Sequence, residues 1–165
     1  HLPTRTVGHR RVTELADAVA STLIEIGWTV SSAGTAPPGE HHFLLEMLDG
    51  GPGWPVVAVV YDEREVVGLY SVLLSATAED VRGDVATYVA AANHGLLLGS
   101  FEVDPADGEV RMKTSFRSGN VADLADELTA QLAFNMAVVA AYAPGLEQVL
   151  AGEAGPHDAI QSVED

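Results

Sequence analysis

Apolar side chains along this chain follow two periods, one typical of helices and one typical of strands. Helical spacing, in which every third or fourth residue is apolar, marks two segments of similar length. Each of these segments would bury one stripe of side chains against a core. The two predicted helices span Val12–Ile26 and Glu79–Asn93.

A third helix is predicted in the last third of the chain. Asn120, with Asp123 three residues later, forms a helix-capping pattern, and the apolar residues after it extend to about Ala141. The segment Phe134–Ala141 is apolar on nearly every side, which predicts deep burial rather than one exposed face. Pro144-Gly145 is expected to break the helix before a short helical piece.

Extended segments rich in β-branched residues lie between the first two helices. Two of them, Val56–Tyr61 and Val66–Leu74, carry apolar residues on both faces, whereas an antiparallel sheet with one wet face would alternate. Both faces are therefore expected to be covered, one by the protein's own helices and the other by another surface. A further strand is predicted over His42–Leu48, and Trp28–Val30 is either a short strand or an edge segment.

A hairpin is predicted between the second and third helices. Asp107-Gly108 separates two alternating runs, which is a strong short-range signal for a tight turn. With that pair as a two-residue loop, Glu102 lies opposite Lys113, so that opposite charges meet across the strands. A wider loop would instead place Asp104 against Glu109, where like charges repel.

The charge balance excludes one class of partner. The 165 residues include 24 acidic and 8 basic side chains, which gives a formal charge of −16. So acidic a surface repels phosphate backbones, and direct nucleic-acid binding is not expected. The acidity either steers the protein toward basic protein surfaces or only keeps it soluble. No apolar run approaches the roughly 20 residues of a membrane span, so no membrane partner is expected.

Length and cysteine content bound the organisation of the chain. The length suits one domain with its own hydrophobic core. We expect a loose arm over residues 1–11, a single domain over residues 12–151 and a tail over residues 152–165. The chain has no cysteine, which excludes disulfides and thiolate metal sites and suits a reducing cytoplasm.

The hairpin and its flanks carry a specific pattern. A helix-ending Asn precedes a G-x-F-x-x-D strand, and a D-G-E-V-R-x-K strand follows. The matching stretches are Ala92–Leu96, Gly99–Asp104 and Asp107–Thr114. With shorter matches elsewhere, this pattern resembles the YbjN-like family over roughly residues 40–164. His94 and Ser100 depart from it, since the family often has an aromatic residue or arginine at the first and asparagine at the second.

The resemblance implies both a fold and a class of function. The family is similar in fold to type III secretion chaperones, which implies an α+β protein with an antiparallel sheet and the order α-β-β-β-α-β-β-α. The family is usually described as regulatory or protein-binding, with no established catalysis. The resemblance therefore implies no enzyme activity, no cofactor and no catalytic residue to carry over.

Histidines are the first candidates for metal or pocket chemistry. His41 and His42 are neighbours on a strand, so they point to opposite faces and cannot share one metal. His42 with His94 and a carboxylate is left open as a metal site. The same two histidines define the alternative hypothesis, a small-molecule-binding domain or cryptic enzyme with its pocket between the second helix and the hairpin. The acidic turn Asp104–Glu109 lacks the alternating ligands of a calcium loop, and a plain hairpin turn is favoured.

Basic residues gather on one face of the second hairpin strand. Arg111, Lys113 and Arg117 form this stripe. Pairing with acidic residues across the hairpin accounts for two of them, and an anchor for an acidic partner is the alternative. Asn93 is expected to be a hydrogen-bonding residue at a helix end rather than a functional amide.

The apolar strands predict self-association. In the register that pairs Tyr61 with Val66, residues Val57, Val59 and Tyr70 share one face, with Val57 opposite Tyr70. Contiguous apolar surface of this kind is seldom left in water, so we expect a two-fold homodimer through this face. The function expected is a non-enzymatic, chaperone-like or regulatory protein-binding module. It would bury an apolar segment of a client protein, with its acidic charge steering basic clients.

Overall fold

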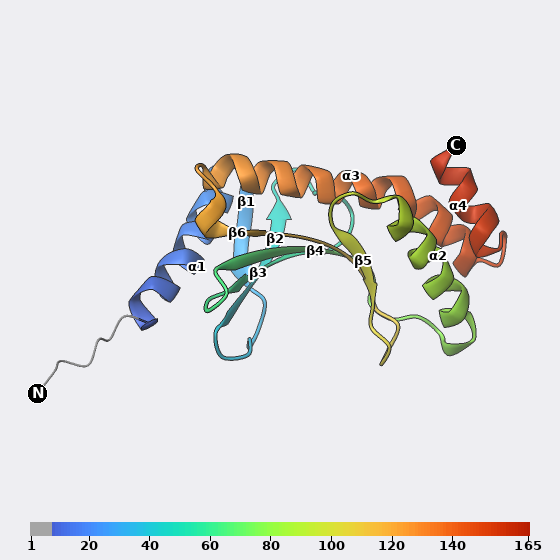
Figure 1. Cartoon of the computed structure of the whole chain (residues 1–165), viewed down its shortest axis with the longest axis horizontal. Helices are drawn as coiled ribbons and strands as arrows, with labels where there is room; N and C mark the ends of the chain where they lie inside the picture. Colours follow the sequence, from blue (N-terminus) through green and yellow to red (C-terminus); the bar gives the residue numbers. More distant parts are fainter. Residues whose placement is uncertain (1–7) are drawn as a thin grey trace, which may run out of the picture.

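Four α-helices and six strands make up residues 8–165, the part of the chain that the computed structural model describes (Figure 1). Residues 1–7 of the expected arm lie outside the described residues. The elements are α1 (Gly8–Glu25), β1 (Trp28–Ser32), β2 (Glu40–Met47), β3 (Val56–Tyr61), β4 (Val66–Leu74), the 3-10 turn η1 (Glu79–Val81), α2 (Arg82–Gly95), β5 (Ser100–Val103), β6 (Val110–Arg117), the 3-10 turn η2 (Ser118–Asn120), α3 (Leu124–Leu150) and α4 (Pro156–Glu164). The first helix therefore begins at Gly8 rather than at Val12.

The strands form a single antiparallel sheet in the order β1-β2-β3-β4-β6-β5. The predicted class, an α+β protein with an antiparallel sheet, is confirmed. The predicted order of elements was incomplete, because it counted three strands before α2. Trp28–Ser32 is a fourth strand, which pairs with β2 from Trp28 opposite Met47 to Ser32 opposite Phe43.

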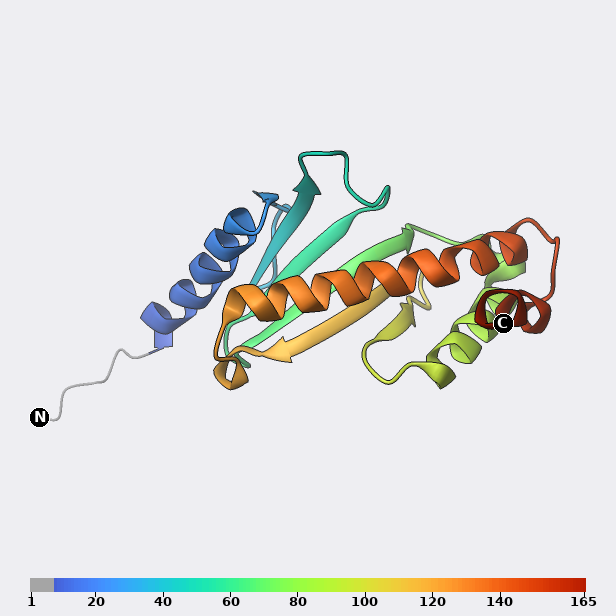
Figure 2. The same ribbon diagram turned by 90° about the horizontal axis from the view of Figure 1, so that it is seen from above.

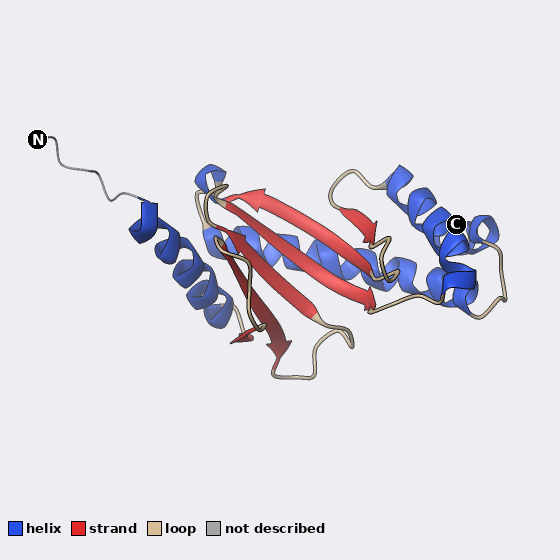
Figure 3. Cartoon of the chain, turned by 90° about the horizontal axis from the view of Figure 1, so that it is seen from below, coloured by secondary structure: helices blue, strands red, loops and turns tan. Residues whose placement is uncertain are grey.

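One face of the sheet is covered by helices, and none of the described helices covers the other. Helix α3 lies along the first face (Figure 1), and α1 packs on the same side. This covered face consists of residues such as Val56, Ala58, Val60, Val67, Leu69, Phe101 and Met112. Figure 3, drawn from the other side, shows the strands with no helix in front of them. This open face is formed by Thr29, Ser31, Glu40, His42, Leu44, Glu46, Val57, Val59, Tyr61, Val66, Gly68, Tyr70, Val72, Ser100, Glu102, Arg111, Lys113, Ser115 and Arg117.

A second part of the core lies at the far end of α3, where α2 and α4 pack together (Figure 2). Ala159 and Ile160 of α4 are buried there. Residues 152–165 are therefore not a tail, as predicted, but contain a helix that belongs to the fold. Pro156 stands in the first turn of this helix, where its missing N–H group has no partner to lose.

Helix α3 continues through Pro144, where the sequence predicted a break. The neighbouring residue explains why the Pro-Gly pair is there. A Cβ atom at Gly145 would lie 2.3 Å from the hydroxyl oxygen of Tyr88 on α2, so only glycine allows this approach. The Tyr88 hydroxyl donates a hydrogen bond of 2.6 Å to the carbonyl of Tyr142. The pair thus marks a contact between two helices, not a helix end.

The predicted deep burial of Phe134–Ala141 is wrong for one side of α3. The positions of this segment that face outward are the alanines Ala137, Ala140 and Ala141, and they are exposed. Alanine is apolar but small, so the apolar pattern continued around the helix without requiring burial on that side. The inward side is fixed by a buried amide. Asn135 donates hydrogen bonds to the carbonyls of Leu69 on β4 (3.0 Å) and Met112 on β6 (3.2 Å), which ties α3 to the centre of the sheet.

Candidate functional site

The open face brings together all of the residues predicted for protein binding. The β3–β4 ladder pairs Tyr61 with Val66 and Val57 with Tyr70, which is the predicted register. The β4–β6 ladder continues the same row from Tyr70 to Lys113. Directly paired residues point to the same face of a sheet. The shared set is Val57, Val59, Tyr70, Arg111, Lys113 and Arg117.

The centre of the open face is covered by its own side chains. Val59 is 5% exposed and Tyr70 is 7% exposed, although none of the described helices lies over them. The Tyr70 ring lies across Gly68, where a Cβ atom would come within 2.9 Å of the ring. Its hydroxyl forms a 2.7 Å hydrogen bond with the hydroxyl of Tyr61. The apolar surface left for a partner is therefore smaller than predicted, with Val57 as its half-buried central member.

A charged network borders this aromatic centre. Glu102 on β5 accepts hydrogen bonds from Arg111 Nε, at 2.8 Å, and from Lys113 Nζ. The Arg111 guanidinium lies over the Tyr70 ring, 4.6 Å from its centroid, in a cation–π contact. Two residues of the basic stripe, Arg111 and Lys113, pair with Glu102. This pairing is one of the two alternatives that the sequence left open.

The network shifts the pKa values of its members. Burial alone would raise the pKa of Glu102, but the hydrogen bonds and positive charges of Lys113 and Arg111 outweigh burial, and its pKa is lowered. Burial, followed by the hydrogen bond with Tyr61, raises the pKa of Tyr70 far above its ordinary value. Glu102 is thus a carboxylate and Tyr70 a neutral phenol at neutral pH.

The hairpin register differs from the two-residue loop that the sequence favoured. Glu102 pairs with Arg111, and Asp104 lies against Glu109, as in the wider loop. The expected repulsion is avoided because the Asp104 carboxylate turns back and accepts a 2.8 Å hydrogen bond from the Ala106 amide. A register shift of two residues leaves every side chain on its predicted face.

Asn93 closes the outer edge of β5. Its amide donates to the Phe101 carbonyl at 3.0 Å and accepts from the Phe101 N–H at 2.7 Å. These are the groups that an added strand would use. The predicted structural role of Asn93 is confirmed, and its side chain takes the place of a neighbouring strand.

The alternative pocket at His42 and His94 is not formed. His42 is on β2 within the sheet and His94 on α2 beyond the end of the sheet, and these elements lie well apart in Figures 1 and 2. His42 lies 2.8 Å from the Glu40 carboxylate, and His41, on the other face, lies 2.8 Å from the Asp62 carboxylate. Within residues 8–165, no three acidic or histidine side chains converge in a way that could hold a metal ion.

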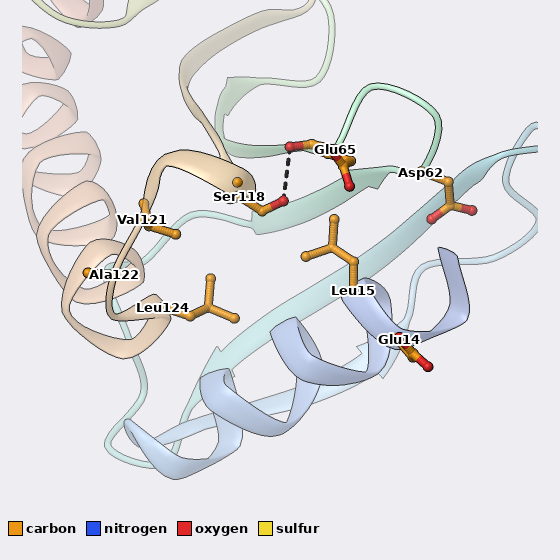
Figure 4. A pocket seen from close by; sticks show the side chains of 9 residues that line it. Glu14, Leu15, Asp62, Glu65, Ser118, Val121, Ala122 and Leu124 are labelled. Atoms are coloured by element: carbon orange, nitrogen blue, oxygen red, sulfur yellow. Dashed lines mark hydrogen bonds between the residues drawn. The ribbon is translucent and has the colours of Figure 1, made fainter. Parts of the chain in front are cut away.

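A cavity that the sequence did not indicate lies between α1, the β3–β4 turn and η2 (Figure 4). Its volume is about 480 Å³. Its lining residues are Glu14, Leu15, Asp62, Glu65, Ser118, Gly119, Val121, Ala122 and Leu124. They come from separate segments that only the fold brings together, so no local motif could have announced them.

Comparison with known proteins found no related family or protein. A scan against protein-family models gives no match, and a search of curated proteins gives none either. The resemblance to the YbjN-like family therefore stays a prediction. In the described part of the chain, none of the helices combines the length and the apolar composition that crossing a bilayer requires.

Proposed function

We propose that this protein is a non-enzymatic, chaperone-like or regulatory module that binds a client protein through the open face. The observation that carries the proposal is a sheet face with an apolar and aromatic centre and no helix over it. The resemblance to YbjN-like proteins, and through them to the type III secretion chaperone fold, supports the same class. A cytoplasmic location is part of this proposal.

The charges of the open face differ from those of the chain. Acidic residues outnumber basic ones by 24 to 8 in the whole sequence. The open face is less acidic. Its strands carry Glu40, Glu46, Glu102, Arg111, Lys113 and Arg117, and Glu109 at the hairpin turn lies 3.8 Å from Arg111. A protein with so large a negative charge can approach another acidic molecule most closely at a surface of this kind.

A second copy fits this arrangement. The acids Glu40 and Glu46 lie on β2, on one side of the apolar centre, and the basic stripe lies on β6, on the other side. A two-fold axis parallel to the strands, between β3 and β4, would place β2 of each copy over β6 of its partner. We therefore propose that a second copy covers the open face until a client replaces it.

Two matched variants test the client-binding surface. Val57→Asp adds a charge to the open face, and Ala137→Asp adds the same charge to the exposed side of α3. Proteins captured from a native extract by the wild type should be retained by Ala137→Asp and lost by Val57→Asp. Equal retention by both folded variants, or equal loss, would contradict binding through the open face.

A further inference from the structure

One row of residues that crosses the open face begins with an acid and ends with an arginine. A row is a line of directly paired residues, one from each strand, whose side chains point to the same face. This row runs from Glu40 on β2 through Tyr61 and Val66 to Arg117 on β6. Arg117 is exposed and has no ion pair among the described residues. The row thus carries opposite charges at its two ends, with an aromatic and an apolar side chain between them.

A second row with the same polarity lies near the other end of the strands. Glu46 lies one position beyond the last β2–β3 pair, opposite Pro55, whose carbonyl accepts a 2.9 Å hydrogen bond from the Val72 N–H group. Val72 in turn pairs with Arg111 on β6. Glu46 is exposed and has no ion pair within the described part of the chain. In both rows the acid therefore stands on β2 and the arginine on β6.

This polarity determines how two copies can meet face to face. A two-fold axis that runs parallel to the strands, between the two faces, keeps every row at its own level. Glu40 of one copy then lies over Arg117 of the second copy, and Glu46 lies over Arg111 of the second copy. Stacked sheets are about 10 Å apart, a distance that a glutamate and an arginine pointing toward each other span. An axis across the strands would instead place β2 over β2 and β6 over β6, where like charges repel.

The two rows between these charged rows are compatible with the same axis. One of them places His42 over Ser115, and the other places Leu44 over Lys113. The methylene stem of Lys113 can pack against an apolar residue while its ammonium group stays with Glu102. No level between the two acids of β2 therefore brings like charges together.

We propose that two intersubunit ion pairs, Glu40 with Arg117 and Glu46 with Arg111, fix the register of a face-to-face homodimer. This register rests on the proposed function, in which a second copy covers the open face, and it names the residues that recognise that copy. The apolar centre supplies most of the association, because exposed ion pairs contribute little free energy. The charges supply selectivity, because like charges placed in contact are strongly unfavourable.

A mixture of two charge-reversal variants tests the register by sedimentation equilibrium. Like charges meet at each contact in a Glu40→Arg homodimer and in an Arg117→Glu homodimer. Each variant alone should raise the dimer dissociation constant about tenfold or more, because the two-fold axis repeats the unfavourable contact. An equimolar mixture should dimerise to within about threefold of the wild type, because each contact then joins an arginine and a glutamate. Glu147→Arg, on the exposed side of α3, has the same net charge as Glu40→Arg and should dimerise as the wild type does.

The decisive contrary result is a wild-type dimer that Val57→Asp dissociates, together with a mixture that dimerises no better than its two components alone. The open-face dimer would then stand, and the proposed register would be wrong. A monomeric wild type would overturn both proposals, and equal effects of Glu147→Arg and Glu40→Arg would overturn the register. If Glu40→Arg does not fold, Glu46→Arg tests the second row in its place, and an unchanged dissociation constant would contradict the pairing.

Discussion

The two faces of the sheet bury their apolar residues in different ways. On the covered face, Val60 and Leu69 are fully buried beneath helices. On the open face, Val59 and Tyr70 are almost as buried, but their cover is the neighbouring side chains of the same face. The comparison shows that an apolar strand pattern predicts burial without predicting what provides it. The same apolar positions can be buried by helices, by a partner protein or by long aromatic side chains of the same face.

The largest difference between the faces should appear when side chains are shortened. Phe101 is 5% exposed on the covered face and meets the Tyr142 ring edge-on, at 5.7 Å between centroids. Phe101→Ala should lower the free energy of unfolding by about 3–5 kcal/mol. Val57→Ala on the open face should cost about 1 kcal/mol, because that side chain is only half-buried. Urea denaturation measures both, and equal losses would remove the distinction.

The next prediction concerns how closely the helices pack on the covered side. Alanine is the better helix former by about 1 kcal/mol, so propensity alone favours Gly145→Ala. The clash of the added methyl group with Tyr88 should outweigh this gain, so that Gly145→Ala lowers the free energy of unfolding by about 1–3 kcal/mol. Gly83→Ala, in α2 with no atom near the added methyl group, should instead stabilise by about 0.5–1 kcal/mol. Thermal unfolding of the pair checks this, and stabilisation by both would show that α2 and α3 are not in close contact.

A charge reversal on the open face should have a smaller effect. Lys113→Glu places a negative charge beside Glu102, with which Lys113 now pairs. We expect Lys113→Glu to lower the free energy of unfolding by about 0.5–1 kcal/mol, measured by the same urea denaturation. A loss greater than that of Phe101→Ala would mean that the two faces are wrongly assigned.

The smallest effect is the pH dependence of the open-face network. The pKa of Glu102 is lowered in the folded protein, so its contribution to stability is present above the ordinary value of 4.5. That contribution is lost as the pH falls through the lowered pKa. Wild type should exceed Glu102→Gln in stability by less than about 1 kcal/mol at neutral pH, and by less still in acid. If the difference in the free energy of unfolding between wild type and Glu102→Gln grew as the pH falls, the assigned ion pairs of Glu102 would be wrong.

Sequence alone indicated much of the fold because local periodicity determines it. The β3–β4 register follows from the turn that joins Tyr61 to Val66, because both strands are apolar on each face and their pattern alone does not select a register. The hairpin register was less determined, because a shift of two residues keeps every face and the choice depends on the Asp104 loop hydrogen bond. Helix α4 was missed because it is short and follows Gly155.

The candidate sites show the same limit. The apolar set Val57, Val59 and Tyr70 and the basic stripe on β6 were each predicted, but the β4–β6 pairing that brings them onto one face was not. That Tyr70 reaches across Gly68 to Tyr61 depends on side-chain conformation, which periodicity does not describe. The cavity of Figure 4 depends on where α1 and η2 meet the β3–β4 turn, a long-range arrangement with no local signal.

Sedimentation equilibrium at micromolar concentration tests most directly whether the open face is a protein-binding surface. Val57→Asp is the informative variant, because Val59 is buried and a charge there would disturb folding. We expect a dimer for the wild type and for Ala137→Asp, and a folded monomer for Val57→Asp. A wild type that stays monomeric, or a folded Val57→Asp variant that remains a dimer, would contradict the proposed interface.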